Sequence, residues 1–193
     1  MKKTTLTLLA ATVMFLAATV VRGAQAVDAG PRYAGMNLLR PVDYRDWVFV
    51  SSGLGMEYEG EKGSGANPRF GNVFVNPSSY RSFMKTGRWP DRTIFVLEFR
   101  ASRTEGSINK GGRFQGDLVV LEAEVKDARY PDGWAFFNFS RDGKLQDVAE
   151  PLPERAGCVE CHTKNTAVER TFVQFYPTLM EVARKMGTVK PGF

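Results

Sequence analysis

The fold is decided at residues 93–99, which run Thr93-Ile94-Phe95-Val96-Leu97-Glu98-Phe99. β-Branched and aromatic residues dominate this stretch, and they favour extended backbone because their side chains pack well on the pleated surface of a sheet. Successive side chains of a strand point to opposite faces, so Phe95, Leu97 and Phe99 share one face. The stretch therefore predicts a strand with one apolar face.

Three other stretches have the same character. They are bounded by Gly, Pro, Asn and Asp, which favour turns. They are residues 71–75 (GNVFV), 116–125 (GDLVVLEAEV) and 133–139 (GWAFFNF). Strands joined by loops, including a glycine-rich loop at 105–116, with few helices between them, predict an antiparallel sheet.

Three helices are predicted around this sheet, at residues 43–48, 78–85 and 167–186. The second ends at Gly87 and the third at Gly187, because glycine readily adopts the left-handed conformation that ends a helix. Pro177 lies within the third and should kink or divide it. The fold class predicted is α+β, an antiparallel sheet framed by a few helices, with a C-terminal helix.

The chain has two cysteines and one histidine, and all three lie in Cys158-Val159-Glu160-Cys161-His162. In a Cys-x-x-Cys-His turn the two thiols can add to the vinyl groups of haem, while the imidazole binds the iron. We therefore predict one haem c per chain, attached through Cys158 and Cys161, with His162 as the metal ligand. The domain is then a single c-type haem domain.

Other interpretations of this motif fit the sequence less well than haem attachment. A thioredoxin-like redox pair would follow a strand at the start of a helix, and the preceding residues 150–157 (EPLPERAG) do not resemble one. Structural zinc takes four Cys or His ligands, and the chain has three. A chance grouping is the remaining alternative.

The single histidine also limits the sixth iron ligand, because a second imidazole of the same chain is excluded. Met, Lys, an oxygen ligand or an open position remain. The candidate methionines are Met36, Met56, Met84, Met180 and Met186. The sequence leaves five- and six-coordinate iron open.

The N-terminus has the pattern of a secretory signal: Lys2 and Lys3, an uncharged apolar run at 6–21, and the small-residue site Ala24-Gln25-Ala26. We expect residues 1–26 to be removed after Ala26 and residues 27–193 to form one domain in the periplasm. An uncleaved membrane anchor is the alternative.

The charge balance is nearly neutral once this segment is removed. Loss of Lys2, Lys3 and Arg22 leaves 23 basic against 21 acidic residues. No Lys/Arg run of the length that nucleic acid or anionic membranes require is present. We expect neither as a partner. With 43% hydrophobic and 24% charged residues, the composition is that of a folded globular domain.

Several phrases together resemble the cytochrome P-460 family and its relative cytochrome c-prime-beta. They occur in order along most of the chain: 43–48 (DYRDWV), 73–77 (VFVNP), 114–117 (FQGD), 125–127 (VKD), 133–137 (GWAFF) and 172–177 (FVQFYP). The resemblance implies an antiparallel-sheet haem domain, usually homodimeric, with a proximal His and an open or weakly occupied distal site.

The two branches of this group differ in one lysine. Proteins like cytochrome P-460 bond a lysine to the haem and oxidise hydroxylamine, whereas c-prime-beta proteins lack that bond and bind nitric oxide in an apolar pocket. Leu97 takes the place of the lysine here. With Phe99 and Phe70, it is expected to contact the haem. Phe95 and Phe74 are expected in the core.

The resemblance and Leu97 favour a nitric-oxide-binding protein of the c-prime-beta kind, exchanging electrons with a redox partner if it has one. An apolar distal wall offers no hydrogen bond to bound oxygen and no base for proton transfer, so it favours small neutral diatomic ligands. The alternatives are a hydroxylamine-oxidising enzyme, for which Glu150 and Glu154 are candidate acidic groups, and an electron-transfer cytochrome with a Met ligand. Whether the chain is an enzyme stays open, with binding favoured.

Overall fold

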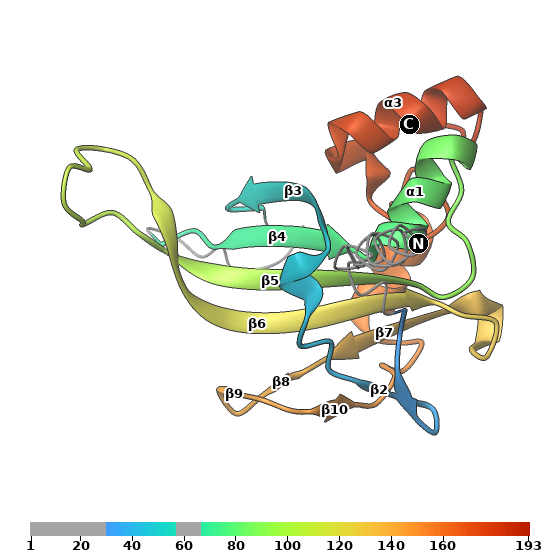
Figure 1. Cartoon of the computed structure of the whole chain (residues 1–193), viewed down its shortest axis with the longest axis horizontal. Helices are drawn as coiled ribbons and strands as arrows, with labels where there is room; N and C mark the ends of the chain where they lie inside the picture. Colours follow the sequence, from blue (N-terminus) through green and yellow to red (C-terminus); the bar gives the residue numbers. More distant parts are fainter. Residues whose placement is uncertain (1–29, 57–66) are drawn as a thin grey trace, which may run out of the picture.

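The computed structural model describes residues 30–56 and 67–193. Its centre is a five-stranded antiparallel sheet with the strand order β3-β4-β5-β6-β7 (Figure 1). The strands are β3 (Val48–Leu54), β4 (Phe70–Val75), β5 (Thr93–Arg103), β6 (Phe114–Lys126) and β7 (Trp134–Asn138). Each strand neighbours the next along the chain, so the sheet is a simple meander.

The register of the sheet sorts its side chains onto two faces. Leu97 of β5 lies opposite Val73 of β4 and Glu122 of β6. Cross-strand partners point to the same side of a sheet, so this row defines one face, which we call the helix face. The neighbouring row, through Val96 and Ala123, belongs to the opposite face.

The opposite face is covered by short strands. β1 (Tyr33–Ala34), β2 (Asn37–Leu39) and β10 (Val148–Ala149) form a three-stranded sheet, and β8 (Ser140–Arg141) pairs with β9 (Lys144–Leu145). Leu38 and Ala149 of the three-stranded sheet pack with Ile94, Val96 and Leu121 of the large one. This layer is one hydrophobic core.

The helix face carries the second core. Phe83 of α1 (Pro77–Thr86) and Leu179 of α3 (Pro177–Met186) pack with Phe95 and Phe136 of the sheet. Figure 1 shows α1 and α3 side by side on this face, and α2 (Gly157–Lys164) contacts β7. The helices lie at one end of the sheet, and they leave the residues at its other end on this face only half-buried.

The fold class is confirmed: an α+β domain with a largely antiparallel sheet and a C-terminal helix. All four predicted strands are present. Two are longer than predicted, since β5 continues to Arg103 and β6 begins at Phe114. They form a hairpin that projects well beyond the rest of the domain (Figure 1).

The helix predicted at 43–48 is wrong. Only Tyr44–Asp46 is helical, as a single 3-10 turn, and Val48 begins the edge strand β3, which the sequence analysis missed. Helices this short are marginal without tertiary support. The run Val48-Phe49-Val50 instead pairs with β4 and completes the sheet.

The helix predicted at 167–186 is also shorter than expected, because it starts at Pro177. Proline suits the first position of a helix and disfavours helical backbone in the residue before it. Residues 167–176 instead form a turn, closed by a bridge between Val168 and Thr171, and the 3-10 turn Val173–Phe175.

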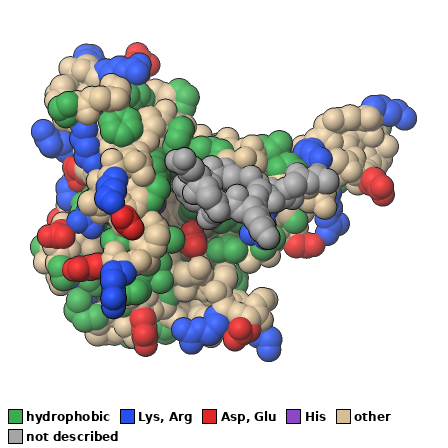
Figure 2. Space-filling model, turned by 180° about the vertical axis from the view of Figure 1, so that it is seen from behind, with side chains coloured by type: hydrophobic (Ala, Val, Ile, Leu, Met, Phe, Trp, Pro, Cys, Tyr) green, Lys and Arg blue, Asp and Glu red, His purple; other side chains and the backbone are tan. Residues whose placement is uncertain are grey.

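Among the described residues, no helix has the length and apolar character needed to cross a membrane. The predicted signal segment, 1–26, lies outside the described residues. Figure 2 shows acidic and basic side chains interspersed over the face of the molecule opposite to the view of Figure 1, with no large patch of one sign.

Candidate functional site

The two cysteines lie on α2, which follows the turn at 153–156. Cys158 is exposed, Cys161 is half-buried, and neither forms a disulfide. Residues three apart on a helix lie on the same side of it. A shallow hollow lined by Gly157, Glu160, Cys161, Lys164 and Asn165 lies along the helix. The helix therefore presents two accessible thiols together.

The imidazole of His162 is held in one tautomer. Its Nδ1 lies 2.7 Å from the backbone carbonyl oxygen of Arg170. A carbonyl can only accept a hydrogen bond, so Nδ1 must carry the hydrogen. Nε2 is then the nitrogen with a free lone pair, which is the form in which an imidazole binds a metal.

Two aromatic rings fix the direction of this imidazole. Phe136 of β7 lies 4.7 Å from its centroid, and Phe172 of the loop after α2 lies 4.5 Å away, at an interplanar angle of 67°. The side chain of His162 is 19% exposed. The ring is thus oriented by packing as well as by its hydrogen bond, as metal-binding histidines usually are.

A carboxylate with one buried oxygen lies beside the imidazole. Oε1 of Glu124, on β6, is 3.4 Å from Nδ1 of His162 and makes no hydrogen bond among the described residues. Burial raises the pKa of Glu124 above its ordinary value, and the attraction of His162 offsets only part of this rise. Burial opposes the charge of His162, but Glu124 and the Arg170 carbonyl raise its pKa overall.

On the helix face of the sheet, the predicted contact residues Leu97 and Phe99 pack close to a glycine. Gly71 lies opposite Phe99 and beside the Val73–Leu97 pair. A Cβ at Gly71 would lie 3.3 Å from Phe99 Cε1 and 3.7 Å from Leu97 Cδ1. The glycine thus makes room for both side chains, which are only half-buried.

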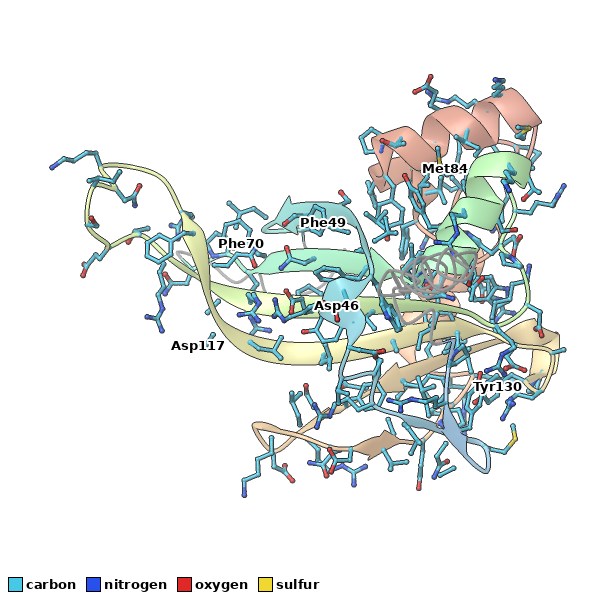
Figure 3. All side chains as sticks on the ribbon, viewed as in Figure 1. Asp46, Phe49, Phe70, Met84, Asp117 and Tyr130 are labelled. Carbon is cyan, nitrogen blue, oxygen red and sulfur yellow. The ribbon has the colours of Figure 1, made fainter. Side chains whose placement is uncertain are left out.

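The register brings some of the predicted contact residues together and excludes one. Leu97 and Phe99 share the helix face with Glu124 and Phe136, the two residues against His162. Phe70 alternates with Gly71 and pairs with Arg100, so it belongs to the opposite face, at the outer end of β4 (Figure 3). The register therefore does not place it with Leu97 and Phe99.

The predicted apolar face is only partly apolar. β4 and β5 supply Val73, Leu97 and Phe99, but the next strand supplies Glu122 opposite Leu97 and Glu124 opposite Phe95. Glu122 accepts a hydrogen bond from Asn138 Nδ2 at 3.2 Å. The wholly apolar wall expected from residues 93–99 alone thus meets two acidic residues on its neighbouring strand.

The core assignments of the sequence analysis are confirmed. Phe95 is 4% exposed and packs edge-on against Trp89, and Phe74 is 8% exposed on the opposite face. The acidic candidates Glu150 and Glu154 are both exposed.

The methionines are spread over the molecule. Met180 is buried in the core between α3 and the sheet, Met84 packs at its margin on α1 (Figure 3), and Met186 is at the exposed end of α3. Met36 lies in the turn between β1 and β2. Met56 has its sulfur over Gly53, which is opposite Gly71, so it reaches the outer end of the helix face.

The donor set fits a covalently attached haem. Two thiols that form no disulfide lie one turn of helix apart, and the adjoining imidazole has Nε2 available. The half-buried Leu97 and Phe99 lie on the sheet face that carries the residues packed against this imidazole. No group of three or more His, Cys, Asp or Glu side chains that could hold a metal ion occurs among the described residues. The site is therefore better suited to a cofactor that brings most of its own metal ligands.

Sequence reasoning missed four parts of this site: Glu124, Phe136, Phe172 and the Arg170 carbonyl. One signal was available. Glu122 and Glu124 alternate with Leu121, Ala123 and Val125, which puts two acidic groups on one face of a predicted buried strand. The carbonyl of Arg170 gave no signal, because a backbone acceptor does not depend on residue type.

Comparison with known protein families supports a haem-binding site. The family model for cytochrome P460 matches residues 41–173, which is more than half of the chain. The matched part contains the five-stranded sheet and the helix with Cys158, Cys161 and His162. No curated protein sequence matches the chain. The chain thus belongs to the cytochrome P460 family, and it is a haem cytochrome.

Proposed function

We propose that this protein is an exported cytochrome with one haem c, attached through Cys158 and Cys161, that binds nitric oxide or a similar small diatomic molecule. His162 is the proximal ligand, and Leu97 and Phe99 line an open distal side. The observation that carries the proposal is the His162 ring, whose Nδ1–H is engaged by Arg170 and whose Nε2 is free.

The haem, when bound, supplies an iron atom with a position for an external ligand. The chain's own residues do the rest. Phe136 and Phe172 orient the imidazole, and Leu97 and Phe99 offer a bound diatomic molecule no hydrogen-bond donor. A wall of this kind favours neutral ligands over the activation of oxygen, which needs proton delivery.

The optical spectrum of the purified holoprotein tests the proposal. We expect a five-coordinate, high-spin spectrum for the ferrous form and its conversion when nitric oxide is added. A low-spin, six-coordinate ferrous spectrum without added ligand would contradict the open site. Acidified butanone should leave the haem on the wild-type chain and extract it from the double variant Cys158→Ala/Cys161→Ala.

One observation supports a second candidate, oxidation of hydroxylamine. Glu122 lies directly opposite Leu97 and could accept a proton near the haem. Against this candidate stands the absence of lysine in residues 93–99. A haem–lysine bond would appear as a cross-linked peptide in the mass spectrum of a tryptic digest. A haem peptide with two thioether bonds and no further link would argue against this candidate.

The position of Met56 supports a third candidate, electron transfer with Met as sixth ligand. Met56 is the methionine whose sulfur reaches the outer end of the helix face. The variant Met56→Leu decides this point. If Met56 binds the iron, the ferrous spectrum of the variant will differ from that of the wild type, and if the site is open the two spectra will coincide.

The proposal includes export and self-association. Export is supported by the signal pattern at 1–26, and N-terminal sequencing of the periplasmic protein should begin at Val27. A homodimer is supported by exposed apolar side chains on the edge strand and the hairpin, Phe49, Val119 and Phe114. Light scattering during gel filtration should give twice the mass of one chain.

A further inference from the structure

The proximal side of the site holds a group that the proposed function does not use. The side chain of Glu124 is only 11% exposed, and its buried Oε1 has no hydrogen bond among the described residues. An ionised carboxylate without partners is costly to bury, by several kcal/mol. Such a group in a folded domain needs a physical explanation.

The surroundings of Glu124 point toward His162. On its own sheet, Glu124 lies between Phe95 of β5 and Phe136 of β7, neither of which can donate a hydrogen bond. The Nδ1 of His162 lies 3.4 Å from Glu124 Oε1. That nitrogen already donates to the Arg170 carbonyl at 2.7 Å. One N–H therefore faces two acceptors.

We propose that Glu124 is a positioning residue for the proximal imidazole, sharing the Nδ1–H of His162 with the Arg170 carbonyl and so increasing the electron density that Nε2 gives to the iron. The inference rests on the proposed function, in which His162 binds haem iron. A carboxylate behind a metal-binding imidazole makes the imidazole a stronger donor. A stronger donor favours ferric over ferrous iron, so Glu124 lowers the reduction potential.

Glu122 offers a matched control on the same strand. It lies two residues away on the same face, so its removal takes away the same charge near the haem. Its carboxylate accepts a hydrogen bond from Asn138, whereas Glu124 Oε1 lies 3.4 Å from His162 Nδ1. A difference between the two positions therefore separates a direct contact with the imidazole from a general electrostatic effect.

The experiment compares the holoproteins of wild type, Glu124→Gln and Glu122→Gln by potentiometric titration. In Glu124→Gln, the ratio of ferrous to ferric protein at a fixed potential should rise about tenfold, which corresponds to about 59 mV for a one-electron couple. Glu122→Gln should shift the reduction potential by less than a third of that amount, which is a change of about twofold in the ratio. Equal shifts, or no shift in Glu124→Gln, would overturn the proposal.

Resonance Raman spectroscopy gives a second readout that does not depend on a variant folding. The iron–histidine stretching frequency of the ferrous wild type should exceed that of haem proteins whose proximal His donates only to a backbone carbonyl. A frequency equal to theirs would also overturn the proposal. Mass spectrometry of the same samples shows whether haem is covalently attached. If it is not, the proposed function fails, and the result is thereby distinguished from failure of the role of Glu124.

Discussion

Nδ1 of His162 lies 2.7 Å from the carbonyl oxygen of Arg170, eight residues further along the chain. This hydrogen bond joins the cysteine-bearing helix to the loop that follows it. It also decides which imidazole nitrogen is free, because the carbonyl can only accept. The orientation of the candidate iron ligand thus depends on how firmly the loop at Arg170 is held.

Lys126 holds this loop against the sheet. Its Nζ lies 2.5 Å from Glu169 Oε2 and 2.7 Å from the Trp89 carbonyl oxygen. Lys126→Met removes both contacts, so we expect the free energy of unfolding to fall by about 2 kcal/mol. Amide hydrogen exchange should also become faster at 166–171. Lys110→Met, in the exposed hairpin loop, is the control, and equal effects of the two substitutions would contradict the role of Lys126.

Phe136 supports the imidazole from within the core. It is 5% exposed, whereas Phe175, which stacks on Phe172 at the surface, is 48% exposed. Phe136→Ala should lower the free energy of unfolding by about 3 kcal/mol, because it leaves a cavity beside His162. Phe175→Ala should cost less than about 1 kcal/mol. Urea unfolding followed by circular dichroism measures both, and similar losses would argue against a special packing role for Phe136.

Glu98 is the centre of a buried polar cluster on the face opposite the site. Its carboxylate, 1% exposed, accepts hydrogen bonds from Tyr44, Arg45, Asn72 and Arg100 at 2.6 to 3.0 Å. Glu98→Gln should lower the free energy of unfolding by about 3 kcal/mol, since it removes the buried charge that four donors share and places a donating amide among them.

The surface ion pair between Arg103 and Asp117 provides the comparison. Both side chains are more than half exposed. Asp117→Asn should therefore change the free energy of unfolding by less than about 1 kcal/mol. The same urea titration serves both variants. A loss in Asp117→Asn as large as that in Glu98→Gln would show that burial is not what makes Glu98 important.

Glu98 also makes the stability of the protein depend on pH. Burial opposes the charge of Glu98, but the hydrogen bonds from Tyr44, Arg100 and Asn72 lower its pKa overall. The unfolded chain then binds more protons than the folded chain once the pH falls below the ordinary glutamate pKa, about 4.3. Stability from Glu98 is present above that pH and is lost as the pH falls through the folded pKa.

Urea unfolding at a series of pH values between 6 and 3 tests this sign. The free energy of wild-type unfolding should decline below about pH 4.5, and the decline should be shallower in Glu98→Gln. Asp127, whose pKa is also lowered overall despite its burial, leaves part of the slope in the variant. Parallel curves for the two proteins would contradict the assignment to Glu98.

Gly71 leaves room for the side chains of Phe99 and Leu97. Gly71→Val adds methyl groups where a Cβ alone would already lie 3.3 Å from Phe99. We expect a loss of about 2 kcal/mol in the free energy of unfolding from overpacking. The affinity of the ferrous holoprotein for nitric oxide should also fall. Gly71→Ala should change stability by less than about 1 kcal/mol, and unchanged affinity in the valine variant would exclude Phe99 and Leu97 from the ligand site.

Much of the sheet could be predicted because its signals are local. Residues 93–99 alternate within one strand, and turn-forming residues bound the four predicted strands, so each could be recognised without its neighbours. The edge strand Val48–Leu54 was missed because its first residues follow a short helical turn. Residues 167–176 were misassigned because apolar spacing alone does not distinguish one long helix from a turn followed by a shorter helix.

The sequence by itself determined the chemistry of the site: two thiols and one imidazole within five residues, and a strand with Leu97 and Phe99 on one face. Only the tertiary structure decided what surrounds them. The meander places Glu124 and Phe136 beside His162, and the loop brings the Arg170 carbonyl to its Nδ1. The physical reason is that residue types and their spacing act along the chain. A cross-strand register or a backbone acceptor takes its place only when distant segments pack together.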